Sequence, residues 1–166
     1  MLKTSNNHGF TLVELMITIA LLAIVATIAV PNFTQFIRNN QVQAKADELG
    51  SFLQYARAQA VSKRKTYEVN FSDISNKVTL KQQDQSGIER ELTVTPATAT
   101  LRFKGNSNNL LVYLPNGTVE DSANISVCFE NEAANGYVIE VRASGLTQRH
   151  ARGRKDSSSN LTNCTL

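Results

Sequence analysis

A run of 21 residues near the N-terminus, residues 10–30, is apolar apart from one charged side chain, Glu14. As an α-helix rising 1.5 Å per residue, the run would be about 31 Å long, close to the thickness of the hydrocarbon core of a bilayer. A cleaved secretory signal is the alternative, but its apolar region would be about 7 to 15 residues and would lead directly into a small-x-small cleavage site. The nearest Ala-x-Ala, residues 44–46, lies well beyond the run. The sequence therefore predicts a retained helix that can span a membrane.

Glu14 needs an explanation, because a carboxylate inside the bilayer costs about 2.5 to 3.5 kcal/mol on insertion scales and is usually paired or functional. No Lys, Arg or His lies between residues 10 and 37, so a cation would have to come from a chain terminus, another subunit or another protein. Alternatively, Glu14 lies at the depth of the lipid headgroups and is solvated. The residues alone leave both interpretations open.

The heptapeptide Gly-Phe-Thr-Leu-Val-Glu-Leu at residues 9–15, with Lys3 before it and Pro31 after the apolar run, resembles the prepilin signature of type IV pilins and type II secretion pseudopilins. The resemblance implies that prepilin peptidase cleaves between Gly9 and Phe10 and methylates the new amino terminus.

On this interpretation residues 1–9 are a leader peptide and residues 10–31 are the transmembrane and assembly helix. The resemblance also implies that Glu14 neutralises the terminal amine of a neighbouring subunit during assembly, which supplies the missing cation.

The helical period continues after Pro31, so residues 32–65 are expected to form the amphipathic second half of the same helix. Its apolar residues recur at a spacing of three to four: Phe33, Phe36, Ile37, Ala44, Leu49, Phe52, Leu53, Ala56 and Ala60. One face of this half would then pack on a domain core.

Beyond Lys65 the apolar period changes to two, which is typical of half-buried strands, and residues 66–166 are expected to form a β-rich domain. Asn, Gly, Ser and Pro bound the short strands that the pattern predicts: residues 66–71, 77–81, 91–95, 101–104, 110–114, 124–129 and 137–142. The predicted fold class is α+β, a type IV pilin fold in which the long helix packs on an antiparallel β-sheet domain.

The second half of the chain is similar to the GspH/FimT family of minor pilins and pseudopilins. The similarity rests on Leu-Pro-Asn-Gly at residues 114–117, a strand ending in Cys128, a basic segment with a glycine, and a late Cys164. The two cysteines lie in the part that would face an oxidising periplasm, so a Cys128–Cys164 disulfide is expected. Closing a loop of about 37 residues would stabilise the fold by roughly 4 kcal/mol.

The net charge of +3, from 17 Lys and Arg against 14 Asp and Glu, hides a basic tail within residues 142–166. Its five cations are Arg142, Arg149, Arg152, Arg154 and Lys155, and no acid lies among them. In an extended loop these cations can follow a phosphate backbone, which predicts salt-sensitive and largely sequence-independent DNA binding. The alternative is a solvated basic loop that assists solubility or contacts neighbouring subunits.

Some FimT proteins serve DNA uptake in natural transformation through a C-terminal Gly-Arg-x-Arg motif. Gly153 and Arg154 match its first two positions, Lys155 falls in the variable one, and Asp156 stands where the last arginine would be. The match is partial, and it makes DNA a candidate partner.

Catalysis and metal binding are not expected, and the sequence predicts no cofactor. Histidine occurs only as His8 and His150, so a catalytic triad or a histidine metal cluster is hard to build. Two isolated thiols cannot form a cysteine-rich zinc site.

The leading hypothesis is a minor type IV pilin that binds extracellular DNA through its basic tail during natural transformation. The alternative is a structural minor pilin or a type II secretion pseudopilin that primes filament assembly without binding DNA. Expected partners are prepilin peptidase, major and minor pilins through the N-terminal helix, and DNA. The precursor would cross the inner membrane once, with its C-terminal domain in the periplasm, before assembly into a pilus on the cell surface.

Overall fold

The long helix predicted from the apolar run is present as α1 (Leu12–Lys63), which continues through Pro31. The structure is a computed structural model that describes residues 10–72, 77–105 and 108–166. By its contacts the chain divides into two units, residues 1–37 and residues 38–166. Gly9 and the rest of the predicted leader lie outside the described residues.

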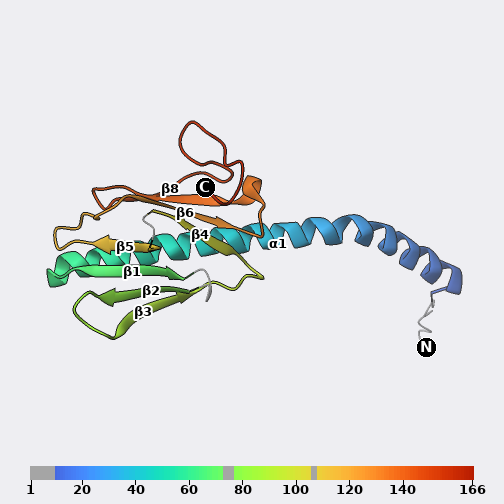
Figure 1. The fold of residues 1–166 in the computed structure, drawn as a ribbon. Helices are drawn as coiled ribbons and strands as arrows, with labels where there is room; N and C mark the ends of the chain where they lie inside the picture. Colours follow the sequence, from blue (N-terminus) through green and yellow to red (C-terminus); the bar gives the residue numbers. More distant parts are fainter. Residues whose placement is uncertain (1–9, 73–76, 106–107) are drawn as a thin grey trace, which may run out of the picture. The chain divides into compact units, whose positions relative to one another are not determined.

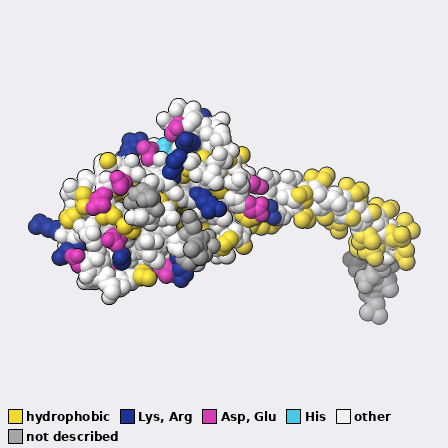
Figure 2. Space-filling view, viewed as in Figure 1, with side chains coloured by type: hydrophobic (Ala, Val, Ile, Leu, Met, Phe, Trp, Pro, Cys, Tyr) yellow, Lys and Arg dark blue, Asp and Glu magenta, His cyan; other side chains and the backbone are white. Residues whose placement is uncertain are grey.

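The N-terminal unit presents its apolar side chains to the surroundings, because every residue from 10 to 37 is exposed. Figure 2 shows them as a continuous hydrophobic surface along this part of the helix. Within the described part of the chain, α1 is the one helix long and apolar enough to cross a membrane. Exposed apolar surface of this extent indicates contact with lipid or with other proteins.

The β-sheet domain that follows the helix consists of two antiparallel sheets (Figure 1), a division that the sequence analysis did not predict. The first has the order β3-β2-β1-β5 and the second the order β4-β6-β7-β8. The strands are β1 (Tyr67–Ser72), β2 (Lys77–Gln82), β3 (Ile88–Thr93), β4 (Thr100–Lys104), β5 (Leu110–Tyr113), β6 (Ala123–Cys128), β7 (Tyr137–Val141) and β8 (Thr147–Arg149). The α+β class and the long helix packed on antiparallel strands are confirmed.

The division into two sheets arises from pairing that alternation does not encode. β1 pairs with β2 on one side and with β5 on the other, where Val69 lies opposite Leu111. β4 pairs instead with β6, with Leu101 opposite Val127. A period of two determines which face of a strand is buried but not which strand lies beside it.

Two strand predictions were wrong. β3 begins at Ile88, before the predicted start at residue 91, and its first residues are exposed, so its outer end lacks the apolar alternation that would have located it. β8 was missed because it is only three residues long and has no buried side chain, since Thr147 is half-buried and the other two residues are exposed.

The core lies between α1 and the inner faces of both sheets. The helix contributes Val42, Ala46, Leu49, Phe52, Leu53, Ala56 and Ala60. Ala44, which we had placed on this face, is exposed. Val42 and Ala46, which are four residues apart, are buried instead. Every buried side chain of the described residues belongs to the unit of residues 38–166, so this unit has a complete core of its own and is expected to fold without residues 10–37.

Candidate nucleic-acid interface

The C-terminal segment, residues 150–166, lies on the face of the β4-β6-β7-β8 sheet that points away from the core (Figure 1). The amide of His150 donates to the carbonyl of Val138 at 2.9 Å, and the hydroxyl of Ser126 donates to the carbonyl of Cys164 at 2.6 Å. Because Val138 and Ser126 are both fully buried, the segment covers the outer face of β6 and β7 and belongs to the packed structure.

A disulfide joins Cys128, at the end of β6, to Cys164, as we expected from the sequence. The two sulfurs lie in a small apolar cluster with Ala133, Val138 and Leu161, separate from the main core. Leu161 of this cluster anchors the C-terminal end of the basic loop of residues 151–161, and the bond from the His150 amide to Val138 anchors its start.

We predicted an extended loop, but in the structure the loop is closed upon itself. The amide of Lys155 donates to the carbonyl of Ser159 at 3.1 Å, and the amide of Leu161 donates to the carbonyl of Gly153 at 2.9 Å. Arg154 and Asn160 face each other in a β-bridge at the base. These backbone bonds hold the loop as an irregular hairpin.

Gly153 is where the chain turns into this hairpin, with φ of +70°. Its amide donates to the carbonyl of Gly136 at 2.8 Å, and a Cβ at Gly153 would lie 2.8 Å from the carbonyl oxygen of Ala134. Only glycine combines this left-handed conformation with such a close approach at no steric cost. The glycine of the partial motif therefore positions the loop on the sheet.

Asp156 caps the tip of the loop. Its Oδ1 accepts hydrogen bonds from the amides of Ser158, at 2.8 Å, and Ser159, at 2.7 Å, and both serine hydroxyls also donate to the carboxylate. The Ser159 hydroxyl and these amides hold the pKa of Asp156 well below its ordinary value. The carboxylate is thus occupied by its own turn and pairs with none of the tail's cations.

Two of the five predicted DNA-binding cations are held by acids of the folded domain. Arg142 donates to Glu140 at 3.3 Å and to Gln148 at 2.9 Å. Arg149 pairs with Asp47 of α1 at 3.2 Å, and its guanidinium stacks over the ring of Tyr137, 4.9 Å from the centroid. These two arginines join β8 to its surroundings.

Arg152, Arg154 and Lys155 are exposed on the closed loop, and none of them forms an ion pair with an acid of the described residues. Arg154 donates to the side-chain oxygen of Asn160 at 3.1 Å, a neutral partner that leaves its charge in place. The structure therefore brings together three of the five predicted cations as unneutralised charge.

His150 is a residue whose role sequence reasoning missed. It is buried, with 8% of its surface exposed, and its Nε2 lies 3.0 Å from Oε2 of Glu140. The same glutamate accepts from Arg142, so it connects β7 to the start of the tail. A histidine directly after an alternating segment was the available signal, but its acidic partner is one strand away.

Of the two residues that flank the predicted cleavage site, the structure describes Phe10, which is 84% exposed. The Glu14 amide donates to the hydroxyl of Thr11 at 3.2 Å, so Thr11 caps the N-terminus of α1. Thr-x-x-Glu is a capping-box pattern that we had not recognised in the sequence. Glu14 therefore lies in the first turn, where a carboxylate also suits the helix dipole.

No group of three His, Cys, Asp or Glu that could hold a metal ion occurs within residues 10–72, 77–105 and 108–166. The chemistry that the described residues place together in this segment is electrostatic.

Two families match the chain. Residues 4–30 match the family described as prokaryotic N-terminal methylation motif, and residues 45–145, more than half of the chain, match the family described as type II transport protein GspH. The basic loop lies beyond the second match.

Curated relatives match over short segments. The type IV major pilin protein PilA of Myxococcus xanthus is 52% identical over 42 residues, 25% of this chain and 19% of that protein. The type IV major fimbrial protein FimA of Dichelobacter nodosus is 45% identical over 46 residues, 28% of this chain and 30% of that protein. The chain thus matches less than a third of the length of these relatives.

Solved structures share the fold over most of the chain. The type IV minor pilin FimU of Pseudomonas aeruginosa superposes with a TM-score of 0.62 at 23% identity, covering 78% of this chain and 98% of that one. The minor pseudopilin EpsH of the type II secretion system of Vibrio cholerae superposes with a TM-score of 0.58 at 14% identity, covering 70% and 99%.

The methylation motif accounts for the N-terminal apolar helix, and the longer match accounts for the helix-on-sheets unit that follows it. The chain belongs to the GspH/FimT family of type IV minor pilins and pseudopilins.

Proposed function

We propose that this protein is a minor type IV pilin that binds extracellular DNA through its C-terminal loop for uptake in natural transformation. The observation that carries the proposal is the closed loop of residues 151–161, which holds Arg152, Arg154 and Lys155 outward with no acid paired to them among the described residues. The capping of its tip by Asp156 keeps the nearest carboxylate occupied.

Phosphate is the chemical group that this loop suits best. Guanidinium groups present forked N–H donors that match phosphate oxygens, and a lysine adds a compact charge. The loop of residues 151–161 has no aromatic side chain on which a base could stack. We therefore expect binding to the sugar-phosphate backbone without sequence preference, on single-stranded or double-stranded DNA.

The N-terminal half of the proposal concerns anchoring and assembly. The methylation motif implies processing by prepilin peptidase, and we assign the cut to the bond between Gly9 and Phe10, with Glu14 neutralising the terminal amine of a neighbouring subunit. Residues 10–31 would hold the precursor in the inner membrane with its C-terminal domain in the periplasm, and would later pack against major and minor pilins. The mass of the native protein tests this assignment, since it should correspond to a chain that begins at methylated Phe10.

The test of DNA binding compares two charge-matched double variants of the unit of residues 38–166 in a mobility shift at low salt. Arg152→Gln with Arg154→Gln removes two cations from the loop. Arg64→Gln with Lys65→Gln removes two exposed cations just beyond the end of α1. We expect the loop variant to bind duplex DNA at least tenfold more weakly and the control to bind as the wild type does. Equal effects of the two variants would show that only net charge matters and would remove the loop from the proposal.

The second candidate is a structural minor pilin or type II secretion pseudopilin that primes filament assembly without binding DNA. It is favoured by the position of the loop outside the residues 45–145 that match the GspH family. Absence of any DNA shift, together with capture of other pilins by the full chain, would support this candidate.

A further inference from the structure

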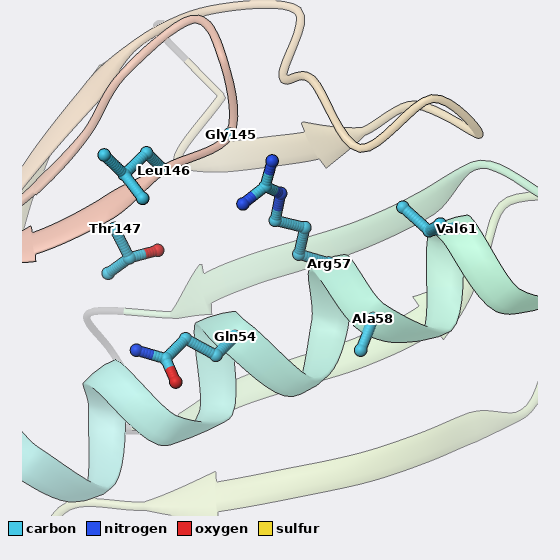
Figure 3. A pocket seen from close by; sticks show the side chains of 7 residues that line it. All are labelled: Gln54, Arg57, Ala58, Val61, Gly145, Leu146 and Thr147. Carbon is cyan, nitrogen blue, oxygen red and sulfur yellow. The ribbon is translucent and has the colours of Figure 1, made fainter.

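A hollow of about 440 Å³ lies between α1 and the segment that joins β7 to β8, away from the basic loop. The helix lines it with Gln54, Arg57 and Val61, and the segment lines it with Gly145, Leu146 and Thr147. Figure 3 shows the Arg57 side chain reaching from the helix toward Gly145, with Leu146 and Thr147 on one side and Val61 on the other.

Arg57 is a half-buried cation that no acid of the described residues neutralises. Its Nε donates to the carbonyl of Gly117 at 2.9 Å, and its Nη2 donates to the carbonyl of Ser144 at 3.2 Å. It forms no ion pair within the described part of the chain. A guanidinium has five N–H donors, so these two bonds orient it and leave others available, while the carbonyls leave its full charge in place.

Two glycines hold the carbonyls around this guanidinium. Gly117 has φ of +83° and Gly145 has φ of +75°. A Cβ at Gly145 would lie 1.9 Å from the carbonyl oxygen of Gly117, so the two turns can meet only where one of them lacks a side chain. The cation is thus fixed by rigid backbone rather than by a flexible partner.

A polar side chain also lines this hollow. Thr147 lines the hollow, and its hydroxyl lies beside the buried hydroxyl of Tyr113. Burial raises the pKa of Tyr113 to about 12, against the opposing effects of the Thr147 hydroxyl and the Arg57 charge.

A neighbouring hollow of about 200 Å³ provides the contrast. It shares Gln54 and Thr147 with the first, but its own cation, Arg149, is already paired with Asp47. Along this groove between helix and strand, Arg57 is therefore the cation left for an external acid.

The rim of the first hollow is apolar. Val61 is 47% exposed and Leu146 is 49% exposed, on opposite sides of the guanidinium. Arginine and apolar contact area are both features of the buried centre of protein interfaces. The combination fits a carboxylate that carries an apolar neighbour.

We propose that this hollow receives an acidic side chain and an adjacent apolar side chain from a neighbouring pilin-type subunit, with Arg57 holding the carboxylate and Val61 and Leu146 contacting the apolar group. Charge complementarity selects an acidic partner, and the apolar rim selects a protein segment over a free anion. The inference does not depend on DNA binding, because none of the residues involved belongs to the basic loop.

The test uses the ¹⁵N-labelled unit of residues 38–166 and two dipeptide probes, N-acetyl-Glu-Leu-amide and the isosteric N-acetyl-Gln-Leu-amide. We expect the glutamate probe to shift the amide signals of Gly117 and Gly145 in a saturable manner, with at least tenfold weaker binding for the glutamine probe. Equal binding of the two probes, or no saturable shift with either, would overturn the proposal.

Two variants that keep Arg57 test whether the glutamate probe binds at this arginine. Gln54→Glu places a carboxylate on the adjacent turn, where it can reach Arg57 and compete with the probe. Gln59→Glu adds the same charge to the same helix at a residue that does not line the hollow. We expect the first variant to lose binding of the glutamate probe and the second to keep it, whereas unchanged binding by Gln54→Glu would exclude this site.

Discussion

The loop is expected to neutralise three phosphates on DNA, because Arg152, Arg154 and Lys155 are exposed and unpaired with acids of the described residues. On duplex DNA the logarithm of the association constant falls with the logarithm of salt concentration, with a slope of about −0.9 per neutralised phosphate. The wild-type slope should then be about −2.7, which is about a 40-fold loss of affinity between 50 and 200 mM salt.

The informative perturbation is Arg152→Gln with Arg154→Gln, which leaves Lys155 as the single free cation of the loop. The slope should fall to about −0.9, and the same increase in salt should then weaken binding only about 3.5-fold. Fluorescence anisotropy of a labelled duplex, titrated with residues 38–166 at several salt concentrations and constant pH, measures both slopes.

The result that would refute this reasoning is a wild-type slope near −4.5, the value for five phosphates. It would mean that Arg142 and Arg149 leave Glu140 and Asp47 to contact DNA, contrary to their pairing in the structure. Arg142→Gln is the matched control, and we expect it to leave the slope unchanged.

Three further predictions concern the framework. Replacing both Cys128 and Cys164 with Ala should lower the free energy of unfolding by about 4 kcal/mol in urea denaturation. The disulfide closes a loop between cysteines 36 residues apart, and without it the unfolded chain gains conformational entropy. Gly145→Ala should cost more than about 2 kcal/mol in the same assay, since φ is +75° and the new Cβ would collide with a carbonyl oxygen of the neighbouring turn. The pKa of Asp156 is lowered in the folded state, so its stabilisation of the loop should be complete above the ordinary value of 3.8 and be lost as the pH falls through the folded-state pKa, which the amide signal of Ser159 should report.

Each of these has a control. Reducing the wild-type disulfide should lower the free energy of unfolding as much as the cysteine variant does. A reduced protein as stable as the oxidised one would contradict the prediction. Gly50→Ala, in the interior of α1 where a Cβ meets open space, should stabilise the fold by about 0.5 to 1 kcal/mol. Asp156→Asn should abolish the acid titration of the Ser159 amide, and a titration that persists would assign it to another group.

Local periodicity explains why the helix and most of the strands could be predicted from the sequence. The apolar run and the three-to-four spacing predicted the helix that is observed as Leu12–Lys63, and alternation located most of the strands. Both patterns arise within one element, where side-chain direction depends only on the neighbours in the chain. The phase error at Ala44 and the missed β8 occur where that local signal is weakest.

The tail shows where local reasoning ends. Composition placed five cations in one segment, but the contacts made in the fold decided which of them remain free of acids among the described residues. Asp47 lies on the helix, far along the chain from Arg149, whereas Glu140 lies on β7 only two residues before Arg142. Gly153 folds the loop back through contacts with residues 134 and 136, so the expected extended conformation is not formed.

The sequence by itself determined the processing motif, the apolar helix, the fold class and the likeness to the GspH/FimT family, because each depends on residues that are adjacent or periodic in the chain. Only the tertiary structure decided the pairing of strands into two sheets, the closure of the basic loop and the isolation of Arg57 beside Gly117 and Gly145. The physical reason is that electrostatic pairing and steric fit act through space, and their partners here come from elements widely separated in sequence.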